Sequence, residues 1–365
     1  MTANKSDDLH SYTFTAIRGL QAEREFFVTI CPMDLIPKIF LYNEEQIPPE
    51  MRAQRTLNKA RIPDIASYLA NNQDDYILSS ITASIDGNVI FEPINENSPL
   101  GVLKIPMSSR IIINDGQHRR AAIERAIQMN PDLAYDSISV VFFIDIGLGK
   151  SQQMFADLNK NAVRPSRSLN ILYNQRSPLS KYICELIDRI EIFKDRVELE
   201  KTSISNRSKK LFTLSNIYQA SSDLLGYKEK DKRLTTEMKD FCFKFWMTLD
   251  ENITEWQLVK LKEKKPVDIR NEFISSHGVT LQAIARVSYE LIETFPTSWD
   301  RKLAFIKNID WSRNNKLWLG RAIINNRVRK NIDNIELVKI AIKNLLDLPL
   351  SKEEVLREKI LQENK

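Results

Sequence analysis

The sequence predicts an α+β protein, with a mixed-sheet N-terminal domain at about residues 10–150 and a mostly helical region over residues 151–365. Three observations support this fold class. Short β-branched runs separated by turn residues fill the first 150 residues. Longer segments with helical spacing of apolar residues follow, with few candidate strands among them. The length of 365 residues also exceeds the usual size of a single domain.

The N-terminal region contains six apolar runs that predict strands. Two helical patterns lie among them, at Ile62–Asn71 and Arg119–Met129. Asp86-Gly87 stands between two apolar runs and predicts a tight hairpin, because Asp-Gly readily adopts the backbone conformations of a type I′ turn. The six predicted strands are Tyr12–Ile17, Phe26–Cys31, Tyr76–Ile85, Gly101–Ile105, Arg110–Ile113 and Ser137–Ile144.

The C-terminal region is dominated by apolar residues at helical spacing. The pattern changes near residue 150, which we take as the domain boundary. The charged segment Lys260–Pro266 predicts a loop. The predicted helices are Ser151–Asn159, Ser180–Phe193, Leu214–Leu225, Lys239–Leu249, Leu281–Phe295 and Ile335–Leu346.

The bulk composition is that of an ordinary soluble protein, with 42% hydrophobic and 28% charged residues. No stretch approaches the roughly 18 uninterrupted apolar residues that a membrane span needs. The first eight residues lack the apolar segment of a signal peptide, so we expect a cytoplasmic protein. Three widely spaced cysteines and three histidines predict neither a disulfide framework nor a metal site.

Positive charge is concentrated in three windows that contain no acidic residue: Leu158–Cys184, Lys201–Ser222 and Trp311–Ile332. At the acidic frequency of this chain, each should carry roughly three Asp or Glu. Cations without nearby carboxylates favour contact with the phosphates of double-stranded DNA. The alternative is a set of solvated faces whose counter-charges come from elsewhere in the fold. The cations predicted to contact DNA are Arg207, Lys209, Lys210, Arg321, Arg327 and Arg329.

Aromatic and sulfur-bearing side chains add two open alternatives. Trp311 and Trp318 could stack on bases, but the apolar neighbours of Trp318 favour a buried position for it. Cys31 follows an apolar strand and precedes Pro32. It is a candidate redox-responsive thiol, or simply a small buried hydrophobic residue.

The segment around Asp115-Gly116 has the form of a strand, a turn and a helix. Gly116 permits a positive φ at the turn. His118, Arg119 and Arg120 then gather at the start of the helix, where free N–H groups and the helix dipole also attract anions. This pattern predicts an anion site, most simply for phosphate. In the alternative, Asp115 caps the helix and the arginines are solvated or paired.

Asp115-Gly116-Gln117-His118-Arg119 is the signature of the DGQHR-domain proteins, and the chain resembles their best-known members, the DNA sulfur modification proteins of the DndB family. The resemblance runs from about residue 10 to 350, nearly the whole chain. Further segments that resemble the family are Gln54-Arg55, Leu57–Ile62, Met154–Val163, Ser208–Ser215 and Gly320-Arg321-Ala322.

The motif is also similar, more distantly, to the strand, turn and helix of ParB and sulfiredoxin. This likeness implies a ParB/sulfiredoxin-like N-terminal domain and a site for ATP or another nucleotide with Mg²⁺. Sulfiredoxin has a cysteine where this chain has Gln117, so its cysteine chemistry is not implied. The residues implied in nucleotide or phosphate binding are Gln117, His118, Arg119, Arg120, Asn159 and Arg164.

The resemblance to the DndB family implies a repressor that binds the promoter of its own DNA phosphorothioate modification genes, with no part in sulfur transfer. The lack of a cysteine pair and of a Walker A motif agrees with this. An enzyme is the alternative, either an NTPase or a ParB-like nuclease, with Asp115, His118 and Arg119 at the reacting phosphate. An adaptor that binds other modification proteins, and a homodimer, also remain open.

Overall fold

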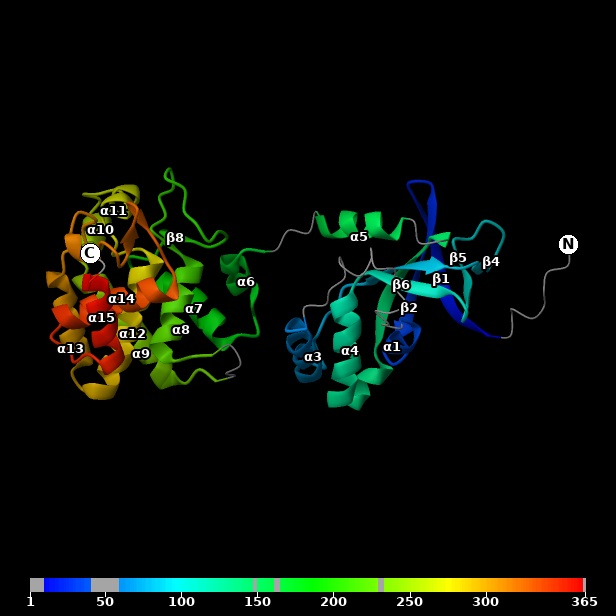
Figure 1. Ribbon diagram of the computed structural model, residues 1–365, viewed down its shortest axis with the longest axis horizontal. Coiled ribbons are helices and arrows are strands. Elements are labelled where there is room, and N and C mark those ends of the chain that lie inside the picture. Colours follow the sequence, from blue (N-terminus) through cyan, green and yellow to red (C-terminus); the bar gives the residue numbers. More distant parts are fainter. Residues whose placement is uncertain (1–9, 41–58, 147–149, 161–164, 229–232, 364–365) are drawn as a thin grey trace. The chain divides into compact units, whose positions relative to one another are not determined.

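A seven-stranded mixed sheet, in the order β4-β5-β1-β2-β7-β3-β6, is the framework of the N-terminal half in the computed structural model (Figure 1). Neighbouring strands are antiparallel except β3 and β7, which are parallel. A mostly helical region follows, so the predicted α+β fold class is confirmed. The strands are β1 (Ser11–Gln21), β2 (Arg24–Pro32), β3 (Ile81–Asp86), β4 (Ile90–Pro93), β5 (Leu100–Pro106), β6 (Arg110–Asp115) and β7 (Ser137–Ile144).

The chain divides into unit 1, Met1–Val163, and unit 2, Arg164–Lys365. Helix α5 (Ser151–Lys160) lies within unit 1, although the sequence pattern changes before it, because this helix packs beside β6. Ser151 Oγ donates a hydrogen bond of 2.6 Å to Asn114 Oδ1 on that strand. The structure describes residues 10–40, 59–146, 150–160, 165–228 and 233–363, and within these ranges no helix has the length and apolarity of a membrane span.

One face of the sheet carries the core of unit 1. In β7, every second side chain is buried, as expected for a strand with one face against a core. The ring of Phe142 from this strand contacts the ring of Phe14 in the core. By contrast, Ile17 in β1 and Ile30 in β2 are more than half exposed. The helices of unit 1 are α1 (Ile36–Ile39), α3 (Arg61–Asn71), α4 (Gln117–Met129), the 3-10 helix η3 (Pro131–Tyr135) and α5.

The hairpin predicted at Asp86-Gly87 is wrong. Strand β3 pairs with β6 and β7, whereas β4 pairs with β5 at the opposite edge of the sheet. Gly87 serves a different purpose, because a Cβ on this residue would lie only 2.3 Å from Ser109 Oγ. The glycine therefore permits a close approach to the turn between β5 and β6, with no need for positive φ.

Unit 2 is built around a helical core of its own. Helix α12 packs against α8 and α14, and α8 begins and ends at the predicted residues. Its helices are α6 (Arg167–Tyr173), α7 (Pro178–Arg189), α8 (Leu214–Leu225), α9 (Thr236–Asn252), α10 (Thr254–Lys260), α11 (Pro266–Glu272), α12 (Gly278–Thr294), α13 (Trp299–Leu303), η5 (Ala304–Asn308), η6 (Lys316–Trp318), α14 (Ile332–Leu345) and α15 (Lys352–Glu363), with the short strands β8 (Val197–Glu198), β9 (Phe212–Thr213), β10 (Ile323–Ile324) and β11 (Arg327–Val328).

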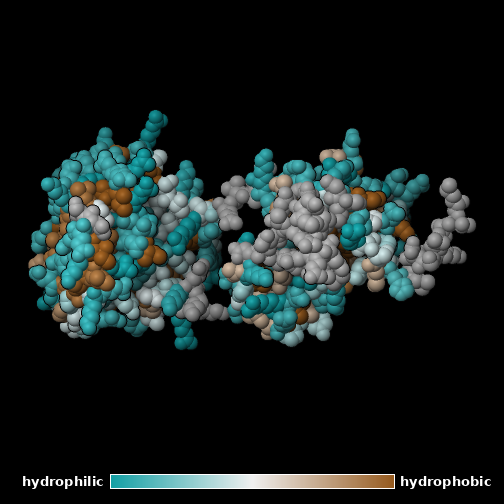
Figure 2. Space-filling view, viewed as in Figure 1, coloured by the Kyte–Doolittle hydropathy of each residue, from teal (hydrophilic) through white to brown (hydrophobic). Residues whose placement is uncertain are grey.

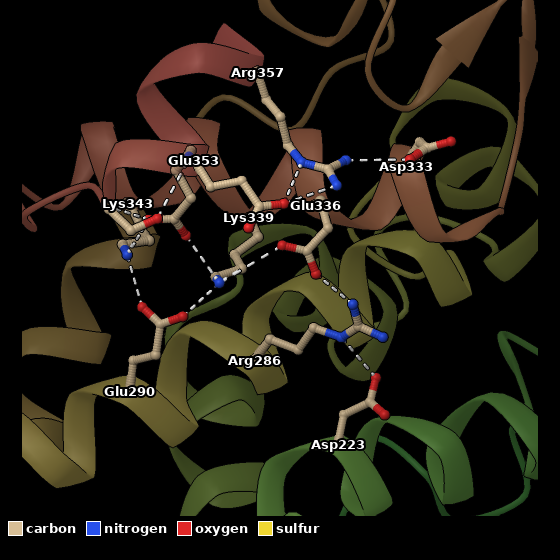
Figure 3. A network of polar contacts seen from close by, with 11 residues as sticks. Asp223, Arg286, Glu290, Asp333, Glu336, Lys339, Lys343, Glu353 and Arg357 are labelled. Carbon is tan, nitrogen blue, oxygen red and sulfur yellow. Dashed lines mark hydrogen bonds and ion pairs between the residues drawn. The ribbon is translucent and has the colours of Figure 1, made fainter.

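The last helix, α15, is held mainly by charge. Glu354 is buried and pairs with Lys343 at 2.8 Å, as part of a network that connects α12, α14 and α15 (Figure 3). On its other side, α15 leaves Leu356 and Ile360 half exposed. Figure 2 shows apolar surface over the C-terminal helices of unit 2. Ion pairs therefore replace much of the apolar packing that normally attaches a terminal helix.

Candidate nucleic-acid interface

The turn between β6 and α4 has the predicted backbone. Gly116 has a φ of 115°, which confirms the positive φ expected from the sequence. A Cβ at this position would also lie 3.0 Å from Ile81 Cγ1 and 3.2 Å from Arg119 Nη2. The arginine thus lies directly over the glycine, and both the conformation and the close contact require glycine here.

Arg119 is held by groups of its own unit. Its Nη2 donates to Asp115 Oδ2 at 2.7 Å and to the carbonyl of Ser80 at 3.1 Å. Its Nη1 donates to Ser79 Oγ at 2.6 Å. These contacts tie the start of α4 to the segment before β3, so the guanidinium is largely occupied by protein groups.

Gln117 and Arg120 also bind backbone carbonyls. Gln117 is buried and donates through Nε2 to the carbonyl of Ile113 at 3.1 Å. Arg120 donates to the carbonyls of Phe40 at 3.0 Å and Pro37 at 3.1 Å, at the end of α1. The last carbonyls of a helix lack intrahelical partners, and Arg120 supplies their donors. Both side chains support the fold at this point.

His118 lies half-buried at the same helix start. Burial, together with the charges of Arg61 and Arg119, lowers its pKa and outweighs the opposite effect of Asp115. The imidazole is therefore neutral near pH 7, and the positive charge here belongs to the two arginines. An anion at this site would meet less charge than the motif alone suggests.

The other residues of the implied nucleotide site are not joined to the motif by any contact in the described ranges. Asn159 is exposed near the end of α5, and its Nδ2 donates to the carbonyl of Phe155 in the same helix. Arg164 lies outside the described residues, as do Gln54-Arg55, Leu57-Asn58 and Asn161–Val163 of the segments that resemble the family.

Unit 2 contains a larger basic feature. A groove of about 720 Å³ is lined by the segment before β8, by residues 207–209 and by the turn that joins α10 to α11. Its apolar floor includes Val259, Pro266 and Val267. We call it the lysine-rich groove because its lining contains Lys194, Arg196, Arg207, Lys209, Lys262, Lys264 and Lys265, against only two acids, Glu191 and Asp195.

Most of the cations in the lysine-rich groove lack an acidic partner. Lys264 pairs with Glu272, and Arg196 donates to the carbonyls of Glu191 and Lys194. The remaining cations are exposed, and within the described ranges none of them forms an ion pair. Exposed positive charge without counter-charge attracts a polyanion at long range. These cations are Lys194, Arg207, Lys209, Lys262 and Lys265.

The cations predicted to contact DNA are not all in one place. Arg207 and Lys209 line the lysine-rich groove, with Lys210 half-buried next to them. Arg321 is only 3% exposed and pairs with Glu358 through both Nη atoms, so it does not reach the surface. The last two predicted cations, Arg327 and Arg329, are exposed on and after β11.

The two tryptophans of the third acid-free window do not form a base-stacking surface. Trp311 and Trp318 are buried and stack on each other, with ring centroids 5.3 Å apart. The indole of Trp318 donates to the carbonyl of Asp310 at 2.9 Å. The buried position that the sequence favoured for Trp318 is confirmed, although the residue lies in a 3-10 turn and not in an α-helix.

Sequence reasoning missed most of the cations in the lysine-rich groove. Lys262, Lys264 and Lys265 fall in the segment that the sequence identified only as a charged loop, and Glu263 interrupts the run. Lys194 is likewise next to an acid, Asp195. A search for acid-free windows cannot find such cations, because the fold brings them together from separate segments.

Cys31 lies in β2 and is fully buried. Burial raises the pKa of its thiol to about 12. Redox-sensitive cysteines are accessible and have a lowered pKa, so this environment favours the small buried hydrophobic residue over the redox-responsive thiol.

Comparison with known proteins gives one result on family membership. Neither the search of curated proteins nor the search of solved structures gave a match, so the likeness to ParB and sulfiredoxin stays a prediction. Residues 14–349, nearly the whole chain, match the model of a family described as DndB, DNA-sulfur modification-associated. The chain therefore belongs to the DndB family of proteins associated with DNA sulfur modification.

Proposed function

We propose that this protein binds double-stranded DNA through the lysine-rich groove and represses a cluster of DNA phosphorothioate modification genes. The observation that carries the proposal is the set of five exposed cations in the groove that have no acidic partner within the described ranges. DNA binding by Lys and Arg releases counterions from the phosphate backbone, which favours such an arrangement. The family's association with DNA sulfur modification supports a role for such binding in that system.

The test of DNA binding is the salt dependence of affinity for promoter DNA of the modification genes. In the triple variant Arg207→Ala/Lys209→Ala/Lys262→Ala, the log–log slope against salt should fall by about 0.9 for each phosphate that the protein no longer neutralises. A matched control removes three exposed lysines outside the groove, by Lys307→Ala/Lys352→Ala/Lys359→Ala. Equal slopes in both triple variants would exclude the lysine-rich groove as the DNA surface.

Repression needs a separate measurement. A reporter gene under the promoter of the modification genes should be repressed by the wild-type protein and by the control variant, and derepressed in the groove variant. If the wild-type protein binds the promoter tightly but does not change reporter output, the repressor function is rejected and a DNA-binding adaptor remains. The two experiments therefore separate binding from regulation.

A nucleotide site at the motif is the second candidate. The observation that favours it is the pair of cations, Arg61 and Arg119, that act on His118 at the start of α4. We propose that ATP or another nucleotide would bind there as an effector or substrate. Arg61→Gln and His118→Gln should then weaken nucleotide binding in a titration and leave promoter binding intact. Unchanged nucleotide affinity in both variants would remove this candidate.

A further inference from the structure

Unit 2 contains a second concave site, on the segment 202–216 that also supplies Arg207 and Lys209 to the lysine-rich groove. It is a pocket of about 250 Å³, which we call the arginine pocket, with Arg270, His277 and Arg313 in its wall. None of the residues that line it is Asp or Glu.

Two arginines line the arginine pocket. Arg270 is 8% exposed and donates to the carbonyls of Ser205 at 2.9 Å and of Lys210. Arg313 uses only Nη2, which donates to the carbonyl of Arg270 at 2.6 Å and lies 3.0 Å from His277 Nε2. Within the described ranges, Arg313 Nε is buried without an acceptor and Nη1 makes no hydrogen bond. The Nη1 donor of Arg313 thus remains available to a ligand.

The two arginines of the pocket have no ion-pair partner in the described ranges. Neither Arg270 nor Arg313 forms an ion pair there, and the neighbouring Glu272 pairs with Lys264. Burial lowers the pKa of both guanidinium groups. Burial, with the charge of Arg313, also lowers the pKa of His277 to about 4 against its hydrogen bond to the carbonyl of Arg270, so the imidazole is neutral near pH 7. Partly buried charges of one sign are costly unless an opposite charge joins them.

Polar groups complete the wall of the pocket. Helix α12 begins at Gly278, where the first N–H groups of a helix lack intrahelical acceptors. Asn216 packs against this glycine so closely that a Cβ there would lie 2.3 Å from Asn216 Oδ1. Lys330 Nζ donates to the same oxygen at 2.9 Å, which adds a third cation at the border of the pocket.

We infer that the arginine pocket binds a tetrahedral oxyanion, the phosphate group of a ligand. Arg313 and Arg270 supply the positive charge of the pocket. A guanidinium matches phosphate in geometry as well as charge, and such hydrogen bonds are among the strongest in proteins. The phosphate belongs either to a small free ligand or to the DNA backbone, since both present the same chemistry. The inference does not depend on the proposed function, because phosphate binding is measurable without DNA.

Titration calorimetry of the full-length protein with inorganic phosphate tests this inference, with chloride at matched ionic strength as the blank. Asn271 is exposed in the pocket wall, so Asn271→Asp adds one negative charge with little effect on folding. It should weaken phosphate binding at least ten-fold, as should Arg313→Gln, which removes a donor. Asn95→Asp, an exposed change in unit 1, is the matched control and should bind like the wild type.

The inference fails if phosphate gives no more heat than chloride, or if Asn271→Asp binds phosphate as well as the wild type does. A competition with promoter DNA then identifies the source of the phosphate. If DNA displaces inorganic phosphate from the wild type, the pocket holds a backbone phosphate. If both bind together, the pocket serves a free phosphorylated ligand. Either result supports the pocket, and failure of DNA binding alone would leave it intact.

Discussion

At the scale of single residues, the DGQHR motif shows what a sequence pattern can and cannot predict. The positive φ of Gly116 followed from the residue types alone. Apart from Asp115 and Glu124, each four positions away, the partners of Arg119 and Arg120 did not, because they are a hydroxyl and carbonyls of segments 39 to 83 positions away along the chain. Only the fold brings Ser80 and Pro37 to the motif. The cations at the helix start therefore predicted a bound anion, whereas in the structure protein groups accept their hydrogen bonds.

Loss of the Arg120 side chain should destabilise unit 1. The guanidinium is largely buried and donates to the carbonyls of Phe40 and Pro37. A buried acceptor that loses its donor costs about 1–3 kcal/mol, so Arg120→Gln should lower the free energy of unfolding by this amount. Chemical denaturation measures it. The matched control is Arg125→Gln, an exposed arginine on the same helix, and equal stability of the two variants would contradict this structural role.

Cys31 should resist modification in the native protein. Its thiol is fully buried, and burial raises its pKa to about 12, so hardly any thiolate exists near pH 7. We expect alkylation at Cys31 only after unfolding, as followed by mass spectrometry of peptides. Cys184 is half-buried, with a pKa also raised by burial, and should react slowly in the folded state. Rapid labelling of Cys31 in the native protein would contradict this expectation and favour the redox-responsive thiol.

At the scale of elements, the spacing of apolar residues predicted helices more accurately than turn residues predicted the pairing of strands. The predicted bounds Leu214–Leu225 match helix α8, whose apolar side chains are buried and which packs against α12. The Asp86-Gly87 hairpin failed because turn chemistry is local, whereas strand pairing depends on the whole sheet. Short helices such as α10 and α11 were missed, since one or two turns carry too little periodicity to be seen.

The attachment of helix α15 should be sensitive to acid. Burial alone would raise the pKa of Glu354, but hydrogen bonds from Lys343, the Ser351 amide and Lys339 outweigh it and lower the pKa from 4.5 to about 2 (Figure 3). A depressed carboxyl pKa stabilises the folded state above about pH 4.5, and this contribution is lost as the pH falls towards 2. At 1.36 kcal/mol per pKa unit, it is on the order of 3 kcal/mol.

The variant Glu354→Gln tests this sensitivity. It should unfold more easily at pH 7 and show a flatter loss of stability between about pH 4.5 and 2 than the wild type, as measured by denaturation at each pH. Glu353→Gln is the control on the same helix, because Glu353 is exposed and its solvent-screened pair with Arg357 should contribute little to stability. A wild-type acid profile in Glu354→Gln would contradict the role of the buried carboxylate.

At the scale of the whole molecule, composition predicted a basic protein but not where its charge would gather. The lysine-rich groove combines Arg207 and Lys209 from an acid-free window with Lys262 and Lys265 from a mixed one. In the same way, Arg321 is buried and not at the surface, because it pairs with Glu358, which is distant in the sequence. A charge window averages neighbouring residues in the sequence, whereas a binding surface combines residues from segments that are far apart in the sequence.

Unit 2 should fold and bind DNA by itself. The hydrophobic core of unit 2 draws its buried residues from positions 171–342 and that of unit 1 from positions 14–142, with no residue in common. Every residue that lines the lysine-rich groove belongs to unit 2. A fragment of residues 165–365 should therefore keep the DNA affinity and the salt slope of the full-length protein.

The tryptophans provide the folding readout for this fragment. All five lie in unit 2, at positions 246, 256, 299, 311 and 318, so tryptophan fluorescence reports on this unit alone. The urea midpoint from fluorescence should agree between the fragment and the full-length protein, because each core can unfold as its own cooperative unit. If the fragment folds with that midpoint but its salt slope is smaller, unit 1 binds phosphates of its own. In that case the exposed Arg61, whose charge acts on His118 at the start of α4, becomes the first residue to test.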